Sequence, residues 1–537
     1  MGRGMAKPYA CTIVSNNYLP FARVLADSLL ATHPDLEFFV LVVDRPDPAI
    51  DYSTEPFRVL FAHELAIPRF RHFAFKYSLL ELNTAVKPFF LQHLHQEFGV
   101  PAVLYFDPDI KILGDLAPLF DSLERKNLLL TPHLLEPLED DLRPSERSIL
   151  LSGVYNLGFL GVRFNDQTVE FLEWWQRRLY SFCLHRVADG LFVDQRWMDL
   201  APCLLPDVEL VRDPGCNVAY WNLANRRLDH GDQGWQVNGV PLRFFHFSGL
   251  VVEDLEQVSK YQDRYKLKDR PDLKALFVEY KKDLLQAGWE SLKDVPNAYG
   301  RFQNGVDVPD LARTDLWSLD SAGDRWPDPF ATEEGSDTYY SWLNGKVNSD
   351  SDPGWLPRMA LILWEHRPDL QSAFPAPLAA DHGNFVRWLL SGESQAAGVD
   401  DRFFGDLETL DLSVDGPATE PEKHDEDPDL ALLSIDAQFD PTTKPRIPRI
   451  ATLIWEKRPD LQDAFQAPLG LSRTEFARWF VTFGRVEYSL PRALWHPTLQ
   501  SLPLAQRAHA YAWRWLLRVR PKDIDTRGSW RDFASSG

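Results

Sequence analysis

Two aspartates separated by one proline follow an apolar run in the first quarter of the chain. The run is Val103-Leu104-Tyr105-Phe106, and Asp107-Pro108-Asp109 comes directly after it. Such a run predicts a buried strand, and ligands of open α/β sheets bind beyond the carboxyl ends of such strands. Because proline stiffens the turn, it presents the two carboxylates at a fixed spacing. Paired carboxylates suit Mg²⁺ or Mn²⁺ carrying a diphosphate, whereas the structural alternative is a turn in which Asp107 caps its own backbone.

Further polar residues stand on or beside apolar segments elsewhere in the first half of the chain. They are His246 with Gly249 three residues on, Asn156 in a run with two glycines, the pair Asp194-Gln195, and the lysines Lys87 and Lys260. Gly249 offers a backbone amide to a phosphate, and the lysines offer counter-charge. Each feature also has a structural alternative: a core histidine, a β-bulge, a helix cap, or a solvated lysine.

Strand-like and helix-like segments alternate over the first 250 residues, and these are the elements that must position those side chains. Strands are predicted at 9–15, 37–43, 103–106, 128–131, 155–164 and 242–247. Helices are predicted from Pro20, over 73–98 with a break at Lys87-Pro88, and over 116–125, 167–185 and 192–200. The expected fold class is therefore α/β, with a mixed, mostly parallel sheet flanked by helices.

Taken in order, these motifs resemble those of nucleotide-sugar glycosyltransferases of the GT-A fold, specifically the family 8-like bacterial enzymes. The resemblance covers about the first 265 residues. It rests on Asn16-Asn17-Tyr18, Ala85-Val86-Lys87-Pro88, Asp107-Pro108-Asp109, Tyr155-Asn156-Leu157-Gly158, Asp194-Gln195 and His246-Phe247-Ser248-Gly249.

The resemblance implies a UDP-sugar donor and a cation, Mn²⁺ or Mg²⁺, bound by Asp107, Asp109 and His246. It implies that Tyr18 stacks on the uracil, that Asn16 or Ser15 reads the edge of the base, and that Asp107 lies near the ribose. Gly249 and Lys260 are implied to contact the diphosphate. Family members often carry Lys-Pro-Trp just after the histidine motif, but Leu250-Val251-Val252 stands here, so Lys87 is the alternative counter-charge.

Asp194, Gln195 and Asn156 are the implied catalytic group, which orients the sugar and stabilises an oxocarbenium-like centre. The resemblance favours retention of anomeric configuration; if the enzyme inverts, Asp194 is the candidate base. Two alternatives remain open. A sugar-phosphate nucleotidyltransferase usually has a glycine-rich basic loop after its first strand, which Ser15-Asn16-Asn17-Tyr18 is not. A non-catalytic scaffold in glycan assembly has no need of the intact Asp107, Asp109 and His246.

Composition limits the partners and the compartment. The formal net charge of −21 opposes binding to nucleic acid. The four cysteines have neither metal-ligand spacing nor the density of a disulfide scaffold, and neither a signal peptide nor a membrane span is apparent. We therefore expect a cytoplasmic protein, or one peripheral at the inner face of the membrane. The expected acceptor is a glycan, a lipid-linked molecule or a protein.

The 537 residues predict several domains, and the second half contains an internal repeat. Residues 357–388 align without gaps on 448–479, with 18 of 32 positions identical. The expected organisation is a GT-A domain at 1–290, a connecting segment at 291–330, tryptophan-rich helical modules at 331–414 and 431–500 with an acidic, proline-rich linker at 415–430 between them, and a basic, aromatic helix and tail at 501–537. The repeated tryptophans are expected in the module cores, and the tail either lies on an anionic membrane or docks on the preceding module.

Overall fold

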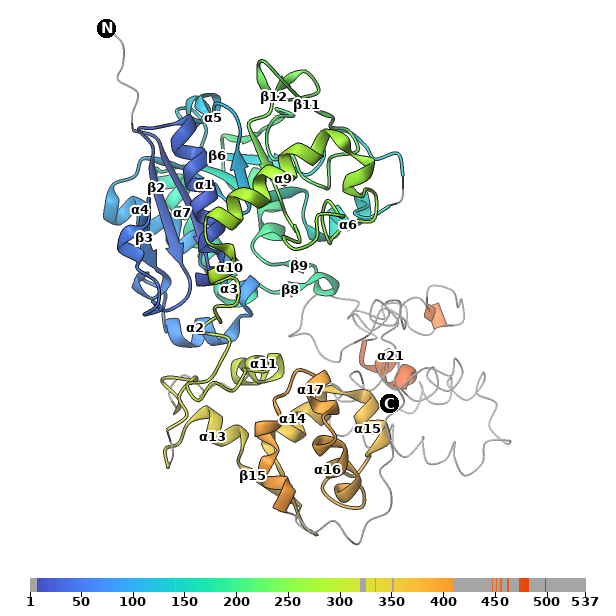
Figure 1. The fold of residues 1–537 in the computed structure, drawn as a ribbon. Coiled ribbons are helices and arrows are strands. Elements are labelled where there is room, and N and C mark those ends of the chain that lie inside the picture. Colours follow the sequence, from blue (N-terminus) through green and yellow to red (C-terminus); the bar gives the residue numbers. More distant parts are fainter. Residues whose placement is uncertain are drawn as a thin grey trace. The chain divides into compact units, whose positions relative to one another are not determined.

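The computed structural model describes residues 7–409 except 141, 319–324, 334, 350 and 351, and beyond these a few positions between 447 and 498. The predicted linker at 415–430 and tail at 501–537 lie outside the described residues, as does most of the second module. The chain divides into two compact units, one formed by Met1–Gly345 with Gln395–Phe403 and the other by Lys346–Ser394 with Phe404–Gly537 (Figure 1). The finer boundaries given above stay predictions.

A seven-stranded sheet forms the centre of the first unit, in the order β10-β6-β7-β4-β1-β2-β3 (Figure 1). Only β7 runs antiparallel to its neighbours, so the sheet is mixed and mostly parallel, and the expected α/β fold class is confirmed. The strands are β1 (Tyr9–Val14), β2 (Glu37–Val42), β3 (Arg58–Phe61), β4 (Ala102–Phe106), β6 (Leu128–Pro132), β7 (Tyr155–Arg163) and β10 (Val208–Leu210).

Successive strand residues point to opposite faces of the sheet, and helices cover both faces because both carry apolar side chains. On one face, Ala10 and Val14 of β1 share a buried cluster with residues of α1 and α5. On the other, Phe39 of β2 contacts Phe98 of α4, which packs beside α7. The main helices of the unit are α1 (Leu19–Thr32), α2 (Phe70–Lys76), α3 (Leu79–Ala85), α4 (Lys87–Phe98), α5 (Ala117–Leu123), α6 (Glu146–Ser152), α7 (Asp166–Phe182), α8 (Ala201–Leu204), α9 (Pro271–Gln286), α10 (Trp289–Leu292), α11 (Asp310–Ser318) and α13 (Tyr339–Leu343).

Three sequence-based assignments need correction. The segment 73–98 forms parts of three helices, because a second break at Ser78 adds to the expected one before Lys87. At this break the Ser78 hydroxyl accepts from the Glu81 amide, and the Glu81 carboxylate accepts from the Ser78 amide. The predicted helix at 192–200 is wrong, since β9 (Leu191–Phe192) pairs with β8 (His185–Arg186) before a 3-10 helix at Gln195–Leu200. The strand predicted at 242–247 is β14 (Phe244–His246), which lies outside the main sheet and pairs with β5 (Ile110–Ile112).

The second unit contains the first copy of the repeat, with β15 (Lys346–Ser349), β16 (Asp352–Pro357), α14 (Arg358–His366), α15 (Pro368–Ala373) and α16 (His382–Leu390). The module at 331–414 was expected to be all-α, and this is wrong, because β15 and β16 form an antiparallel pair within it. Phe385 and Trp388 are buried and stacked, and so are their counterparts Phe476 and Trp479, of which Trp479 ends α21 (Arg473–Trp479). A side-chain hydrogen bond is repeated as well: the Gln371 Nε2 donates to the Trp364 carbonyl at 3.0 Å, and the Gln462 Nε2 donates to the Trp455 carbonyl at 3.1 Å. The duplication in sequence is thus also a duplication of local packing at the described positions.

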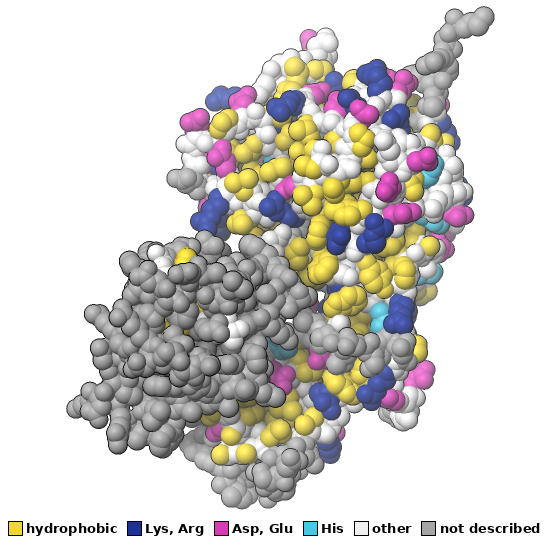
Figure 2. All heavy atoms as spheres, turned by 180° about the vertical axis from the view of Figure 1, so that it is seen from behind, with side chains coloured by type: hydrophobic (Ala, Val, Ile, Leu, Met, Phe, Trp, Pro, Cys, Tyr) yellow, Lys and Arg dark blue, Asp and Glu magenta, His cyan; other side chains and the backbone are white. Residues whose placement is uncertain are grey.

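The described surface mixes charge and apolar area. Seen from behind, acidic and basic side chains are interspersed among apolar ones (Figure 2). Among the described residues, no helix combines the length and the hydropathy needed to cross a lipid bilayer.

Candidate metal centre and active site

The Asp107-Pro108-Asp109 turn joins β4 to β5 at the carboxyl end of β4. The Ile110 amide donates to the Asp107 carbonyl at 3.2 Å and closes the turn. The Asp107 amide donates to the Gly158 carbonyl on β7 at 2.7 Å, and the Tyr105 hydroxyl donates to Asp107 Oδ1 at 2.7 Å. Asp107 is therefore held by its neighbours, and its second carboxylate oxygen takes no part in these bonds.

His246 reaches this turn through the β5–β14 pair. In the antiparallel register His246 lies opposite Ile110, next to Asp109, and the Phe247 amide donates to the Asp109 carbonyl at 2.8 Å. Phe245 and Phe247, on either side of His246, both contact Phe277 of α9, so the imidazole points away from that core.

The three predicted metal ligands come together in the structure. The His246 Nε2 lies 3.0 Å from Asp109 Oδ1 and 3.9 Å from Asp107 Oδ2. Each residue offers one ligand atom, and these atoms lie within 4.8 Å of one another. Burial favours the neutral imidazole, but the charges of Asp109 and Asp107 outweigh it and raise the pKa of His246. Carboxylate and imidazole groups are both ligands of divalent metal ions, so the three residues fit a cation site.

Gly158 makes room for the imidazole. A Cβ at this position would lie 2.3 Å from the Cε1 and 2.6 Å from the Nδ1 of His246. The glycine that the sequence places inside β7 is therefore explained by the close approach of His246. The indole of Trp221 packs edge-on against the same ring, with centroids 5.2 Å apart.

A buried ion pair lies near the turn. The Lys87 Nζ is 2.6 Å from Asp194 Oδ2, and both side chains are almost fully buried. The Lys87 Nζ also donates to the Leu157 carbonyl at 3.1 Å and lies 4.2 Å from the centre of the Tyr105 ring. Burial raises the pKa of Asp194, and the charge of Lys87 opposes this rise. Lys87 thus neutralises Asp194, and its contact with a diphosphate stays a prediction.

The residue before Asp194 has a strained backbone. Val193 is buried and has φ 41°, in the left-handed region that β-branched residues avoid. Its amide donates to the Leu184 carbonyl at 3.0 Å. Such conformations cost roughly 1–3 kcal/mol and concentrate at functional sites, so the strain accompanies the placement of Asp194.

Asn156 and Gln195 bind each other. The Gln195 Oε1 accepts from Asn156 Nδ2 at 3.3 Å and from the Leu157 amide at 3.1 Å, and its Nε2 donates to the Ser152 carbonyl at 2.9 Å. Both ends of the Gln195 side chain are therefore engaged within the protein.

The loop after β1 contains the 3-10 helix at Asn16–Tyr18. The Asn16 side chain donates to the Arg45 carbonyl and accepts from the Tyr52 hydroxyl, and the Ser15 hydroxyl donates to Asn17. These polar groups are used to fix the loop. By contrast, the Tyr18 ring is 39% exposed and stacks on Phe21 with centroids 4.7 Å apart, so it remains accessible to a ligand.

Gly249 and Lys260 lie beside each other in the structure. The Lys260 amide donates to the Gly249 carbonyl at 3.0 Å, and Gly249 has φ 70°. A Cβ on Gly249 would lie 2.5 Å from atoms of both Ser259 and Tyr261. Lys260 is exposed, and its Nζ lies 5.1 Å from the centre of the Tyr261 ring.

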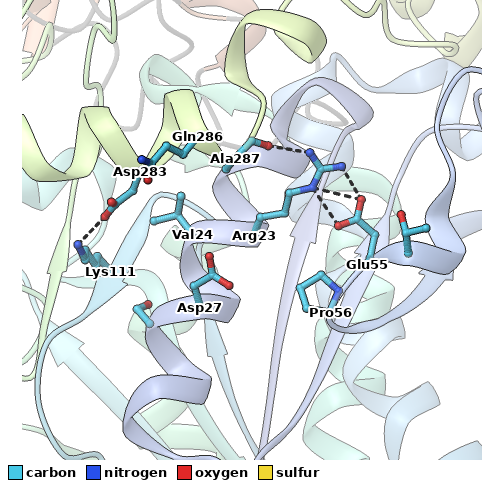
Figure 3. A pocket seen from close by; sticks show the side chains of 11 residues that line it. Arg23, Val24, Asp27, Glu55, Pro56, Lys111, Asp283, Gln286 and Ala287 are labelled. Atoms are coloured by element: carbon cyan, nitrogen blue, oxygen red, sulfur yellow. Dashed lines mark hydrogen bonds and ion pairs between the residues drawn. The ribbon is translucent and has the colours of Figure 1, made fainter.

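The other side of β5 borders a pocket of about 510 Å³ between α1 and α9 (Figure 3). Arg23 pairs with Glu55 and donates to the Ala287 carbonyl there, and Lys111 pairs with Asp283 and with Glu279. Lys111 is two residues beyond Asp109, so these ion pairs anchor β5 to α9 close to the metal centre.

Two polar residues that the sequence did not single out support the site. Asn217 hydrogen-bonds to His246, and Asp44 accepts from the Asn16 amide and from the Ala298 amide, both at 2.9 Å. Asp44 directly follows an apolar strand, as the predicted metal ligand Asp107 does, and that signal was available. Asn217 lies in an irregular segment with no such signal.

No family model matches the chain. Two proteins of Bacillus subtilis, both described as uncharacterized, are 25% identical to it: YfnF over 280 residues, which are 51% of this chain and 92% of YfnF, and YfnD over 304 residues, which are 55% of this chain and 93% of YfnD. Among solved structures, the galactosyltransferase LgtC with donor and acceptor sugar analogs is 17% identical, with a TM-score of 0.32, over 51% of this chain and 95% of that one. The glycosyltransferase GlyE of Streptococcus pneumoniae is 15% identical, with a TM-score of 0.30, over 55% of this chain and 67% of that one.

Proposed function

We propose that this protein is a metal-dependent glycosyltransferase that moves a hexose from a UDP-sugar to a glycan or glycoconjugate acceptor, with retention. The observation that carries the proposal is the convergence of Asp107, Asp109 and His246 at the end of β4. The motif resemblance adds the donor class, because the aspartate pair, the asparagine strand and the histidine motif occur in the family's order.

The bound cation would supply Lewis-acid neutralisation of the charge that develops on the departing diphosphate. The exposed ring of Tyr18 offers a stacking surface for the base, and Gly249 with Lys260 offers an amide and a positive charge to the phosphates. The Asp194 carboxylate is only 2% exposed and paired with Lys87. An acceptor hydroxyl cannot reach it without rearrangement, which argues against Asp194 as the general base that inversion would require and thereby supports retention.

One assay separates this proposal from its alternatives. The protein is incubated with a panel of nucleotide sugars and Mn²⁺, with and without chelator, and released nucleoside diphosphate is measured. We expect metal-dependent release from a UDP-hexose, at least as slow hydrolysis. Pyrophosphate formation from a sugar 1-phosphate and a nucleoside triphosphate would instead identify a nucleotidyltransferase, and the absence of both reactions would favour a scaffold.

A matched pair of variants tests the metal centre itself. Asp109→Ala is expected to abolish release and to keep the melting temperature of the metal-free protein, while Asp121→Ala, which removes an exposed carboxylate on α5, is expected to change neither. If Asp109→Ala unfolds the protein, the turn is structural and the proposal loses its main support.

A further inference from the structure

Asn217 is a buried polar residue at the back of the metal centre, in the irregular segment between β10 and β11 (Leu228–Gly231). Its side chain connects three residues that are far apart in the sequence. Its Nδ2 donates to Thr131 Oγ1 at 2.7 Å and to Asn156 Oδ1 at 3.0 Å, and its Oδ1 lies 3.2 Å from His246 Nδ1. One carboxamide thus joins a predicted metal ligand to a predicted sugar-orienting residue.

The partners fix the direction of this carboxamide. The Thr131 hydroxyl donates to the Asn156 carbonyl at 3.3 Å, so its oxygen accepts from Asn217, and Asn156 Oδ1 already accepts from the Gly158 amide at 3.1 Å. Both atoms on this side are acceptors and require the Nδ2 of Asn217. Its Oδ1 must therefore face His246, and an amide oxygen can only accept, so the Nδ1 of His246 must carry a proton.

This arrangement selects the ligand atom of the imidazole. A neutral imidazole with its proton on Nδ1 has its lone pair on Nε2, the nitrogen that faces Asp109 and Asp107. Metal-ligating histidines usually donate their other N–H to a polar partner that holds the tautomer and the ring orientation.

The backbone at this position also suits asparagine. Asn217 has φ 52°, in the left-handed region that asparagine tolerates better than most residues with a Cβ. The position requires a residue that accepts a positive φ and that carries a carboxamide. Glycine lacks the carboxamide, and leucine has a similar size but no polar atoms.

We infer that Asn217 is a positioning residue that fixes the tautomer of His246 for cation binding and couples it to Asn156. The inference rests on the proposed function for its meaning, and its test does not require a turnover measurement. The probe is Mn²⁺ alone, titrated calorimetrically into the full-length protein.

We expect Asn217→Ala to weaken Mn²⁺ binding by about 10- to 100-fold, the range for removing a partner of a metal-bound histidine. Asn217→Asp keeps an oxygen that accepts from His246 Nδ1 but loses the hydrogen bonds that Nδ2 donates to Thr131 and Asn156. It is therefore expected to bind Mn²⁺ more tightly than the alanine variant. Its glycosyltransferase activity is still expected to fall, because Asn156 is no longer held in place. The matched control is Asn127→Ala, which removes an equally buried carboxamide whose Nδ2 donates to the Pro206 carbonyl and whose Oδ1 accepts from Arg163 and Asn165, away from the centre. Its Mn²⁺ affinity is expected to be unchanged even if its stability falls.

A second readout follows the tautomer without metal or substrate. In protein labelled with ¹⁵N-histidine, with the His246 signals assigned by their loss in His246→Gln, the wild type is expected to show a proton on Nδ1 facing Asn217, while Nε2 shares a proton with Asp109 as long as no metal is bound. Equal Mn²⁺ affinity in wild type and Asn217→Ala, or a wild-type Nδ1 that carries no proton, would overturn the inference and leave the proposed function standing. A wild-type protein that binds no Mn²⁺ would instead remove the proposed function.

Discussion

Adding a single methyl group to Gly158 is expected to displace His246 from the metal centre. The added Cβ of Gly158→Ala would lie 2.3 Å from the His246 Cε1, whereas ordinary contacts begin at 3.4 Å, so the ring must move by roughly 1 Å. The backbone cannot yield easily, because the His246 amide donates to the Val218 carbonyl at 2.8 Å and the Gly158 carbonyl accepts from the Asp107 amide. The φ of Gly158 lies outside the left-handed region, so the substitution acts through this contact rather than through backbone strain.

The size of the effect follows from the tolerance of metal coordination. Ligand distances vary by only about 0.2 Å, so a ring displaced by roughly 1 Å no longer coordinates. We expect Gly158→Ala to weaken Mn²⁺ binding by at least about 100-fold and to lower the free energy of unfolding by about 1–3 kcal/mol through overpacking.

The control lies on the same strand. Gly161→Ala places its Cβ 2.9–3.0 Å from the Leu129 side chain, so it also overpacks the sheet but does not touch the centre. Calorimetric Mn²⁺ titration and urea denaturation of both variants separate the two effects. If Gly158→Ala binds Mn²⁺ like the wild type, or if both variants lose affinity equally, the assignment of His246 as a ligand positioned by Gly158 is refuted.

Three further predictions concern the residues around this centre. Lys87→Met leaves the Asp194 carboxylate buried without its cation, so urea denaturation is expected to show a free energy of unfolding lower by about 3–5 kcal/mol. The double variant Lys87→Met/Asp194→Asn is expected to recover much of this loss. An unchanged denaturation midpoint in Lys87→Met would contradict the pairing. Burial raises the pKa of Asp44 from 3.8 to about 6, so the folded state holds this proton more tightly than the unfolded state. The contribution of Asp44 is therefore most favourable below about pH 4 and is lost as the pH rises to about 6, by about 3 kcal/mol; Asp44→Asn should lack this slope in denaturation curves measured from pH 4 to 7. Tyr18→Ala removes the exposed ring and is expected to raise the KM for the UDP-sugar by about 10- to 100-fold with little change in kcat. A fall in kcat with an unchanged KM would contradict this and would place the ring at the chemical step.

The strands of the sheet core were predictable because their apolar runs are local and strong. The extra helix break in 73–98 was also signalled, by the Ser78 and Glu81 of a capping box. The short edge strand β3 was not, since it is partly exposed and begins with Arg58. The segment at 192–200 misled because Phe192 and Val193 look apolar and helical, while the positive φ of Val193 depends on its surroundings.

The site residues also divide into those that the local sequence predicts and those that depend on distant contacts. The aspartate pair and His246 end strand-like runs, and their meeting was expected from the motif order. The pairing of Lys87 with Asp194 was not predictable, because nothing near Lys87 in the sequence identifies Asp194 as its partner.

The candidate metal centre depends on local contacts and on contacts between segments far apart in the sequence, and each kind fixes a different part of its geometry. Asp107 and Asp109 owe their spacing to one turn, which the sequence specifies within three residues. The imidazole has no such local support: Gly158 leaves it space, Asn217 faces its Nδ1, and β5 pairs with its strand. β5 is in turn tied to α9 by the ion pairs of Lys111. A carboxylate pair alone binds divalent cations weakly, so the contacts that hold the third ligand decide whether the turn is a metal site or only a turn.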